Sequence, residues 1–153
     1  MLASLLIGLA AGQRAMTPPA VLAVAARQGA LPSGAPAGSL LRRPGALAGL
    51  LALGLAEMAG DKMPSAPDRT VLPGLLARTF TAAFAGAVLA PRAQRPAGAG
   101  LAAAVALGSA FGGVALRRRS MDAFGRTPSG LAEDAAVVLC AVLAIAAARR
   151  RRD

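Results

Sequence analysis

The sequence contains no histidine, tryptophan or tyrosine and only one cysteine, and these absences exclude much chemistry. Histidine is the commonest metal ligand and the commonest general base near neutral pH. A single cysteine, Cys140, forms neither a disulfide within the chain nor a cysteine-pair metal site. The sequence also lacks a serine–histidine–aspartate set and a phosphate-binding glycine motif. We therefore expect no metal site, no cofactor and no enzyme activity.

Positive charge is abundant, but its distribution does not suit nucleic-acid binding. The formal net charge is +10, and almost all the positive charge is arginine because Lys62 is the only lysine. With four phenylalanines as its only aromatic residues, the chain lacks a platform for stacked bases. The arginines cluster beside apolar segments, at 42–43, 117–119 and 149–152. Such clusters are typical of loops that meet lipid headgroups, so we expect membrane lipids as partners and no nucleic acid.

The chain is too apolar for an ordinary soluble domain, since 56% of its residues are hydrophobic and 16% are charged. Its apolar residues fall in runs close to the ~20 residues that cross a bilayer core. We predict an all-α, polytopic transmembrane helical bundle, which forms a single integral membrane domain over residues 1–153 and has about five spans. The predicted spans are 2–28, 44–60, 71–90, 97–116 and 130–148, separated by loops at 29–39, 60–68, 91–96 and 117–129.

The first of these segments is predicted to be a broken helix. Pro18 and Pro19 follow Thr17, and two consecutive prolines interrupt the backbone hydrogen bonds of a helix. A signal peptide is the competing interpretation of residues 1–15, but no basic region precedes the apolar stretch. Five spans with a cytoplasmic C-terminus place the N-terminus outside. Basic residues favour that orientation by a small margin, which leaves the reverse orientation open.

Ionisable residues within apolar segments indicate a functional site, because a charge in hydrocarbon costs ~3 kcal/mol or more. Arg14 and Glu57 are the least easily explained by helix ends or membrane interfaces. We expect Arg14 to face the protein interior, where it pairs with Glu57 or binds an anionic group. Arg78, which lies close to Thr79 and Thr81, is a similar candidate.

A second group of candidates lies where the second apolar segment ends. Glu57 and Asp61 are four residues apart and share one helix face, so together they can bind a cation or relay a proton. Lys62 is adjacent, and Pro64 stops the helix. Asp61 and Lys62 are equally well explained as interfacial residues in a solvated turn.

Glu133 and Asp134 form a third group near the start of the last span. One interpretation is structural: Ser129 caps the helix, and both acids stabilise its first turn. The other is functional: one acid points inward and one outward, because neighbouring helical residues lie ~100° apart. Both interpretations stay open at this point.

Small residues recur four apart in two of the predicted spans. They are Gly45 and Gly49 in one, and Ala104, Gly108 and Gly112 in the other. This spacing lets helix backbones approach closely in lipid, either within the chain or between copies in a homo-oligomer. The alternative is chance, because the chain is rich in alanine and glycine.

Three motifs in order, GQRAMTPPAVLA, LAEMAGDKMP and TPSGLAEDAAVVL, resemble a family of small bacterial membrane proteins, the domain of unknown function 4126. The resemblance runs from end to end of the chain, and it departs mildly where Thr127-Pro128-Ser129 replaces the expected Ser-Pro. It implies a multi-spanning inner-membrane protein but implies no activity. Its motif residues here are Gly12, Arg14, Pro18, Glu57, Asp61, Lys62, Pro64, Pro128, Ser129, Glu133 and Asp134.

These observations predict a small transporter- or channel-like protein of the inner (plasma) membrane, with a buried charged site for a small ion or solute. The alternative is a structural or interaction protein whose buried charges are salt bridges that set helix register. The order of the segments is also compatible with an inverted repeat, in which spans one and four correspond. A lipid-acting enzyme is a third hypothesis, and it requires a lateral cleft that reaches the acids.

Overall fold

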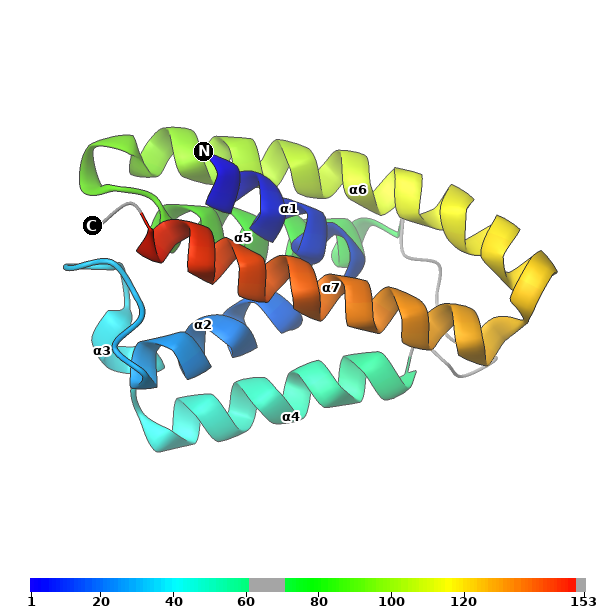
Figure 1. Ribbon diagram of the computed structural model, residues 1–153, viewed down its shortest axis with the longest axis horizontal. Helices are drawn as coiled ribbons and strands as arrows, with labels where there is room; N and C mark the ends of the chain where they lie inside the picture. Colours follow the sequence, from blue (N-terminus) through cyan, green and yellow to red (C-terminus); the bar gives the residue numbers. More distant parts are fainter. Residues whose placement is uncertain (61–70, 151–153) are drawn as a thin grey trace.

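The computed structural model describes residues 1–60 and 71–150, and every regular element within them is helical (Figure 1). The all-α prediction is therefore confirmed for this part of the chain. Asp61 and Lys62 lie outside the described residues, so their roles stay predictions. The elements are α1 (Leu2–Gln13), α2 (Thr17–Arg27), α3 (Gly38–Leu41), α4 (Pro44–Gly60), α5 (Leu72–Leu89), the 3₁₀ helix η1 (Arg92–Gln94), α6 (Arg95–Phe124) and α7 (Arg126–Arg149).

Three segments are long and apolar enough to cross a membrane: Leu72–Leu89, Arg92–Phe124 and Arg126–Arg149. Helices α1 and α4 are apolar but shorter. Large apolar side chains are exposed on α5, α6 and α7, which suits a lipid environment better than water; they include Leu76, Phe80, Phe111, Leu139 and Leu143. The expected count of five spans is not confirmed, and the inverted repeat stays a prediction.

The first apolar segment is broken, as its prolines predicted, but it also folds back on itself. α1 ends at Gln13 and α2 begins at Thr17. Pro18 and Pro19 lie in the first turn of α2, where their missing N–H groups interrupt no helical bond. In Figure 1, α1 and α2 run in opposite directions and return the chain to the end from which α1 started.

This fold-back changes the expected arrangement of the chain ends. The start of α1 and the end of α7 lie at the same end of the bundle, together with the start of α4 (Figure 1). A continuous first span would have placed the start of α1 at the other end. The expected placement of the termini on opposite sides of a membrane stays a prediction, and the fold-back is not a feature that hydropathy reveals, because hydropathy alone does not distinguish one long helix from two short antiparallel ones.

The predicted loop at 117–129 is also wrong, because α6 continues to Phe124 and α7 begins at Arg126. Arginine, methionine and alanine are good helix formers, so a polar run rich in them extends a helix once its apolar part has formed. Gly125 alone separates the two helices, with a φ of 83°. Glycine adopts this backbone conformation without steric strain.

Close backbone packing occurs at glycines other than those expected. A Cβ added at Gly8 on α1 would lie 2.6 Å from the carbonyl oxygen of Ala102 on α6. A Cβ added at Gly12 would likewise collide with the carbonyl oxygen of Ala106 and with Cβ of Ser109. The backbones of α1 and α6 are therefore in direct contact.

The small residues that recur four apart in the sequence do not make such backbone contacts within the described residues. Apart from the neighbouring backbone of the same helix, no described atom lies within 4 Å of a Cβ added at Gly45, Gly49, Gly108 or Gly112. These residues and Ala104 are exposed. The prediction of a tight interface within the chain at these positions is therefore wrong, and contact between copies stays a prediction.

The α1–α6 contact gives a direct test of this packing. Gly12→Ala should lower the free energy of unfolding by about 1–3 kcal/mol, because the added methyl group meets the carbonyl of Ala106. Gly108→Ala is the matched control, since its Cβ meets no described atom and alanine favours a helix by up to ~1 kcal/mol. Thermal unfolding in detergent measures both. Equal stability of the two variants would contradict the packing described.

Candidate functional site

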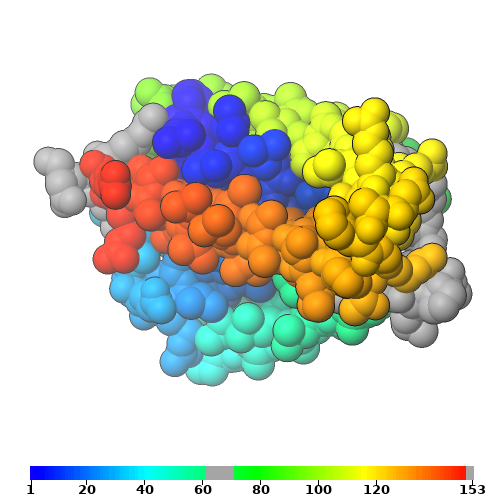
Figure 2. Space-filling view, turned by 45° about the vertical axis from the view of Figure 1, so that its right-hand side comes forward, coloured from blue at the N-terminus to red at the C-terminus, as the bar shows by residue number. Residues whose placement is uncertain are grey.

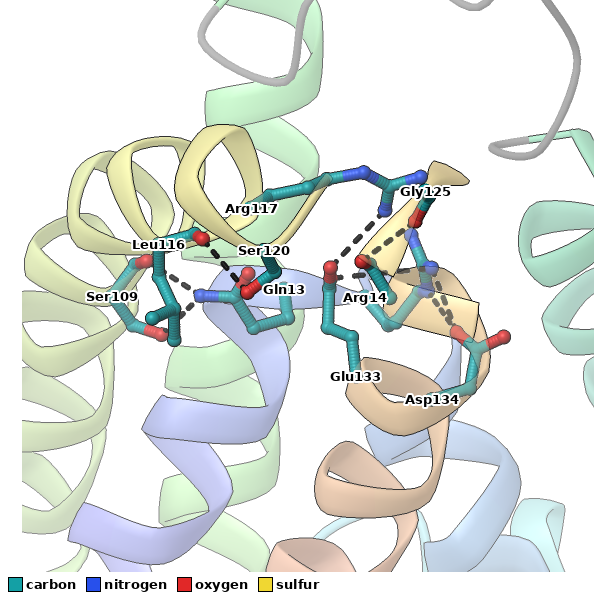
Figure 3. A network of polar contacts seen from close by, with 10 residues as sticks. Gln13, Arg14, Ser109, Leu116, Arg117, Ser120, Gly125, Glu133 and Asp134 are labelled. Carbon is teal, nitrogen blue, oxygen red and sulfur yellow. Dashed lines mark hydrogen bonds and ion pairs between the residues drawn. The ribbon is translucent and has the colours of Figure 1, made fainter. Parts of the chain in front are cut away.

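Arg14 occupies the break between α1 and α2, and its side chain is enclosed by protein. The residue is 0% exposed. Its Nε and Nη2 atoms donate to Oδ1 of Asp134, at 2.9 and 2.7 Å (Figure 3). The inward-facing role expected for Arg14 agrees with this placement, but its acidic partner comes from α7.

Glu133 extends this pair into a network that alternates in sign. Its Oε1 lies 4.0 Å from Nη2 of Arg14. Its Oε2 accepts a hydrogen bond at 3.1 Å from Nη1 of Arg117, which comes in from α6. The order Asp134, Arg14, Glu133, Arg117 pairs two acids with two bases, so these four described side chains together carry no formal net charge (Figure 3). Such balance is what burial of several ionised groups requires.

The two neighbouring acids differ in how far water reaches them. The side chain of Asp134 is 12% exposed and binds the fully buried Arg14, whereas the side chain of Glu133 is 17% exposed. Both nevertheless contribute to one network, so neither simply points outward. The alternative that Ser129 caps α7 is wrong: α7 starts three residues earlier, and the Ser129 hydroxyl donates to the carbonyl of Gly125 at 2.7 Å.

Glu57 reaches the same break from α4, but it binds backbone rather than Arg14. Its Oε1 accepts from the N–H of Ala15 and its Oε2 from the N–H of Met16, both at 2.8 Å. These N–H groups directly precede α2, whose N-terminus attracts negative charge. The expected Arg14–Glu57 pair is therefore not formed, and the Glu57 carboxylate on α4 instead binds the backbone just before α2.

Arg78 and Thr17 add buried polar atoms to the interior. Arg78 is 8% exposed on α5, a helix that packs mainly on α1 and α6 rather than on α7. Thr17 is 4% exposed at the start of α2, and its hydroxyl has no hydrogen-bond partner among the described residues. A buried hydroxyl of this kind usually binds water or another polar species.

A groove of about 720 Å³ opens beside the network, between α1, α6 and α7. We call it the α6–α7 groove. These three helices meet on one face of the molecule (Figure 2). Its walls are mostly apolar, with polar groups where the network reaches it; they include Leu9, Gln13, Ser109, Leu116, Arg117, Ser120, Phe124, Glu133, Ala136, Val137 and Cys140.

Three polar residues of this site were not identified from sequence. Gln13 donates from Nε2 to the carbonyl oxygen and hydroxyl of Ser109, at 2.6 and 2.8 Å, and thereby holds the end of α1 to α6 (Figure 3). Arg117 was assigned to a loop. No spacing in the sequence links α6 to α7, so no local signal pointed to an Arg117–Glu133 pair.

Fold and site together define the class: a helical protein with three helices that can cross a membrane and a buried network of ionised side chains. No protein-family model, curated protein or solved structure matches the chain. Resemblance to the domain of unknown function 4126 therefore stays a prediction.

A double-mutant cycle tests the deepest ion pair. Arg14→Met and Asp134→Leu should each lower the free energy of unfolding by about 3–5 kcal/mol, because each removes the closest ion pair of a charge that stays buried. The double variant should lose less than the sum, since neither charge remains. Arg118→Met, at an exposed position, should stay within about 0.5 kcal/mol of wild type. Additive losses in the cycle would refute the pairing.

Proposed function

We propose that this protein is a small transporter- or channel-like membrane protein that moves a proton or a small cation, with the carboxylates on α7 as its binding groups. One observation carries the proposal: α1 ends and α2 begins beside a cluster of buried ionised residues. Broken helices with polar groups at their ends are the usual setting of ion sites in transporters.

Glu133 is the residue best suited to exchange its arginine partner for a proton or a cation. It lies between Arg14 and Arg117, and it lines the α6–α7 groove. A proton or cation that binds Glu133 weakens its hold on Arg117, whereas Asp134 still neutralises Arg14. The site can therefore change its charge without leaving the deepest arginine unpaired.

Arginine placement supports an orientation in the membrane. The end at which α1 starts and α7 finishes includes Arg27, Arg42, Arg43, Arg92, Arg95, Arg149 and Arg150, whereas the end near Gly125 includes Arg117, Arg118, Arg119 and Arg126. Cytoplasmic loops carry the excess of basic residues. We propose a multi-pass inner-membrane protein whose described chain ends both face the cytoplasm.

A structural role is the second candidate, and the mutual pairing seen among the described residues favours it. Arg14, Asp134, Glu133 and Arg117 are mutually paired, and Glu57 is bound by two backbone N–H groups. Such a network can hold α1 and α2 in their folded-back arrangement without transporting an ion. The two candidates differ in whether ion flux depends on Glu133.

Flux measurements on reconstituted protein distinguish the transport role from the structural role. Proteoliposomes should show proton or monovalent-cation flux above protein-free vesicles, measured with trapped pyranine under a potassium diffusion potential and with sodium- and potassium-selective electrodes. Glu133→Gln keeps the shape of the side chain but removes its charge, and it should reduce this flux at least about tenfold, as expected for the loss of one charge-assisted contact.

Asp122→Asn is the matched control, because Asp122 is an exposed acid on α6 outside the network. Its flux should equal that of the wild type. Absence of flux in every preparation, with Glu133→Gln changing only thermal stability, would support the structural role and contradict transport.

A further inference from the structure

A second, smaller hollow lies where α2 ends, between the last turn of α2, the loop that follows and α3, which lie side by side in Figure 1. We call it the α2–α3 pocket. Its volume is about 230 Å³, below the ~300–1,000 Å³ of most sites that enclose a whole small molecule. Gly29, Gly34 and Gly38 line it, together with Ser33 and Arg42. Unlike the α6–α7 groove, this pocket is lined mainly by polar groups.

Three arginines meet at this pocket, and each donates to a backbone carbonyl rather than to an acid. Nε of Arg42 donates to the carbonyl oxygen of Gly38 at 3.2 Å, and Nη2 of Arg95 donates to that of Gly34 at 2.5 Å. Nη1 of Arg27 donates to the carbonyl oxygen of Arg42 at 3.5 Å. A carbonyl oxygen orients a guanidinium but does not neutralise its charge. These contacts therefore hold three positive charges close together.

The acids among the described residues all lie elsewhere in the fold. Glu57 binds the backbone just before α2 begins, whereas the pocket lies where α2 ends. Asp122, Glu133 and Asp134 belong to the parts of α6 and α7 near the joint between these helices. The pocket thus offers hydrogen-bond donors and positive charge, with no described carboxylate to hold an ammonium group. A phosphate suits it, because several phosphate oxygens can accept from one guanidinium at the same time.

The contact between Arg95 and Gly34 also relates the pocket to the membrane-crossing part of the fold. Arg95 is the first residue of α6 and lies near one end of Arg92–Phe124, a segment that can cross a membrane. The pocket is therefore level with the end of that segment, which is the depth of the lipid headgroups. Basic pockets beside the ends of membrane-crossing helices bind the heads of anionic lipids. This position favours a lipid over a free anion as the source of the phosphate.

We propose that the α2–α3 pocket binds the phosphate of one anionic phospholipid of the phosphatidylglycerol class. The Arg42 guanidinium contacts the phosphate oxygens, the Ser33 hydroxyl donates to one of them, and Arg27 and Arg95 attract the charge from the rim. An ethanolamine head is disfavoured, because it brings a cation to a pocket that is rich in arginine. The site is independent of ion transport, since the residues that line it do not belong to the network of Arg14.

Lipid binding by the purified full chain is the direct test. Wild-type protein in a mild detergent is titrated with phosphatidylglycerol, phosphatidylethanolamine or inorganic phosphate, and native mass spectrometry measures the affinity for the first bound molecule. Phosphatidylglycerol should bind at least about tenfold more tightly than phosphatidylethanolamine, as expected for one charge-assisted contact. Equal affinity for the two lipids would overturn the proposal. Binding of inorganic phosphate as tight as that of phosphatidylglycerol would overturn the assignment to a lipid.

Two variants with the same loss of charge examine whether the pocket itself is the site. Arg42→Gln should weaken phosphatidylglycerol binding at least about tenfold and leave phosphatidylethanolamine binding unchanged. Arg118→Gln is the matched control, because Arg118 is exposed on α6 and does not line the pocket. It should change the affinity for phosphatidylglycerol by no more than about twofold. Equal losses in the two variants would show diffuse attraction to a basic protein and contradict a specific site.

A second readout leaves every arginine in place. In a Cys140→Ala background, Ser33→Cys places a thiol in the wall of the pocket, whereas Ser39→Cys places one at an exposed position of α3 that does not line it. Added phosphatidylglycerol should slow alkylation of the Ser33→Cys variant by N-ethylmaleimide at least about tenfold and leave that of the Ser39→Cys variant nearly unchanged. Equal slowing of both reactions, or of neither, would contradict the proposed position of the phosphate.

Discussion

Burial of the Arg14 guanidinium is the constraint from which the rest of the structure follows. A charge enclosed by apolar helices is tolerated only when an opposite charge and hydrogen bonds meet it there. Asp134 supplies both, through two hydrogen bonds to one carboxylate oxygen. Because Arg14 stands where α1 ends and Asp134 stands on α7, the pair ties the break in the first segment to the last helix and so stabilises the fold-back of α1 and α2.

The other polar groups of the interior follow from the same break. A helix that stops inside a bundle exposes backbone groups that must find partners. Glu57 satisfies two N–H groups before α2, and Gln13 joins the end of α1 to Ser109 on α6. Glu133 is bound less deeply, between Arg14 and Arg117, and it borders the α6–α7 groove. Glu133 is therefore both part of the ion-pair network and part of the groove wall.

Sequence reasoning located the break, the helix at residues 44–60 and most of the ionised residues, because prolines, apolar runs and charges in hydrocarbon are local signals. It did not find the partners. Arg14 was expected to pair with Glu57 or to bind an anionic group, but Asp134 on α7 lies against its guanidinium, and which helices are neighbours depends on the whole bundle. Residues 117–129 were assigned to a loop because polarity was given more weight than helix propensity. The fold-back of α2 leaves no local trace, since either direction buries the same apolar residues.

The fold-back of the first apolar segment places both of its ends on one side of a membrane, and this can be measured directly. In a Cys140→Ala background, single cysteines at the exposed positions Leu2 and Gln28 are labelled in sealed, oriented vesicles with a membrane-impermeant maleimide. A cysteine at Arg126 reports the opposite end of the bundle. We predict that cysteines at Leu2 and Gln28 react from the same side and the cysteine at Arg126 from the other. Reaction of cysteines at Leu2 and Gln28 from opposite sides would show one continuous span and contradict the account.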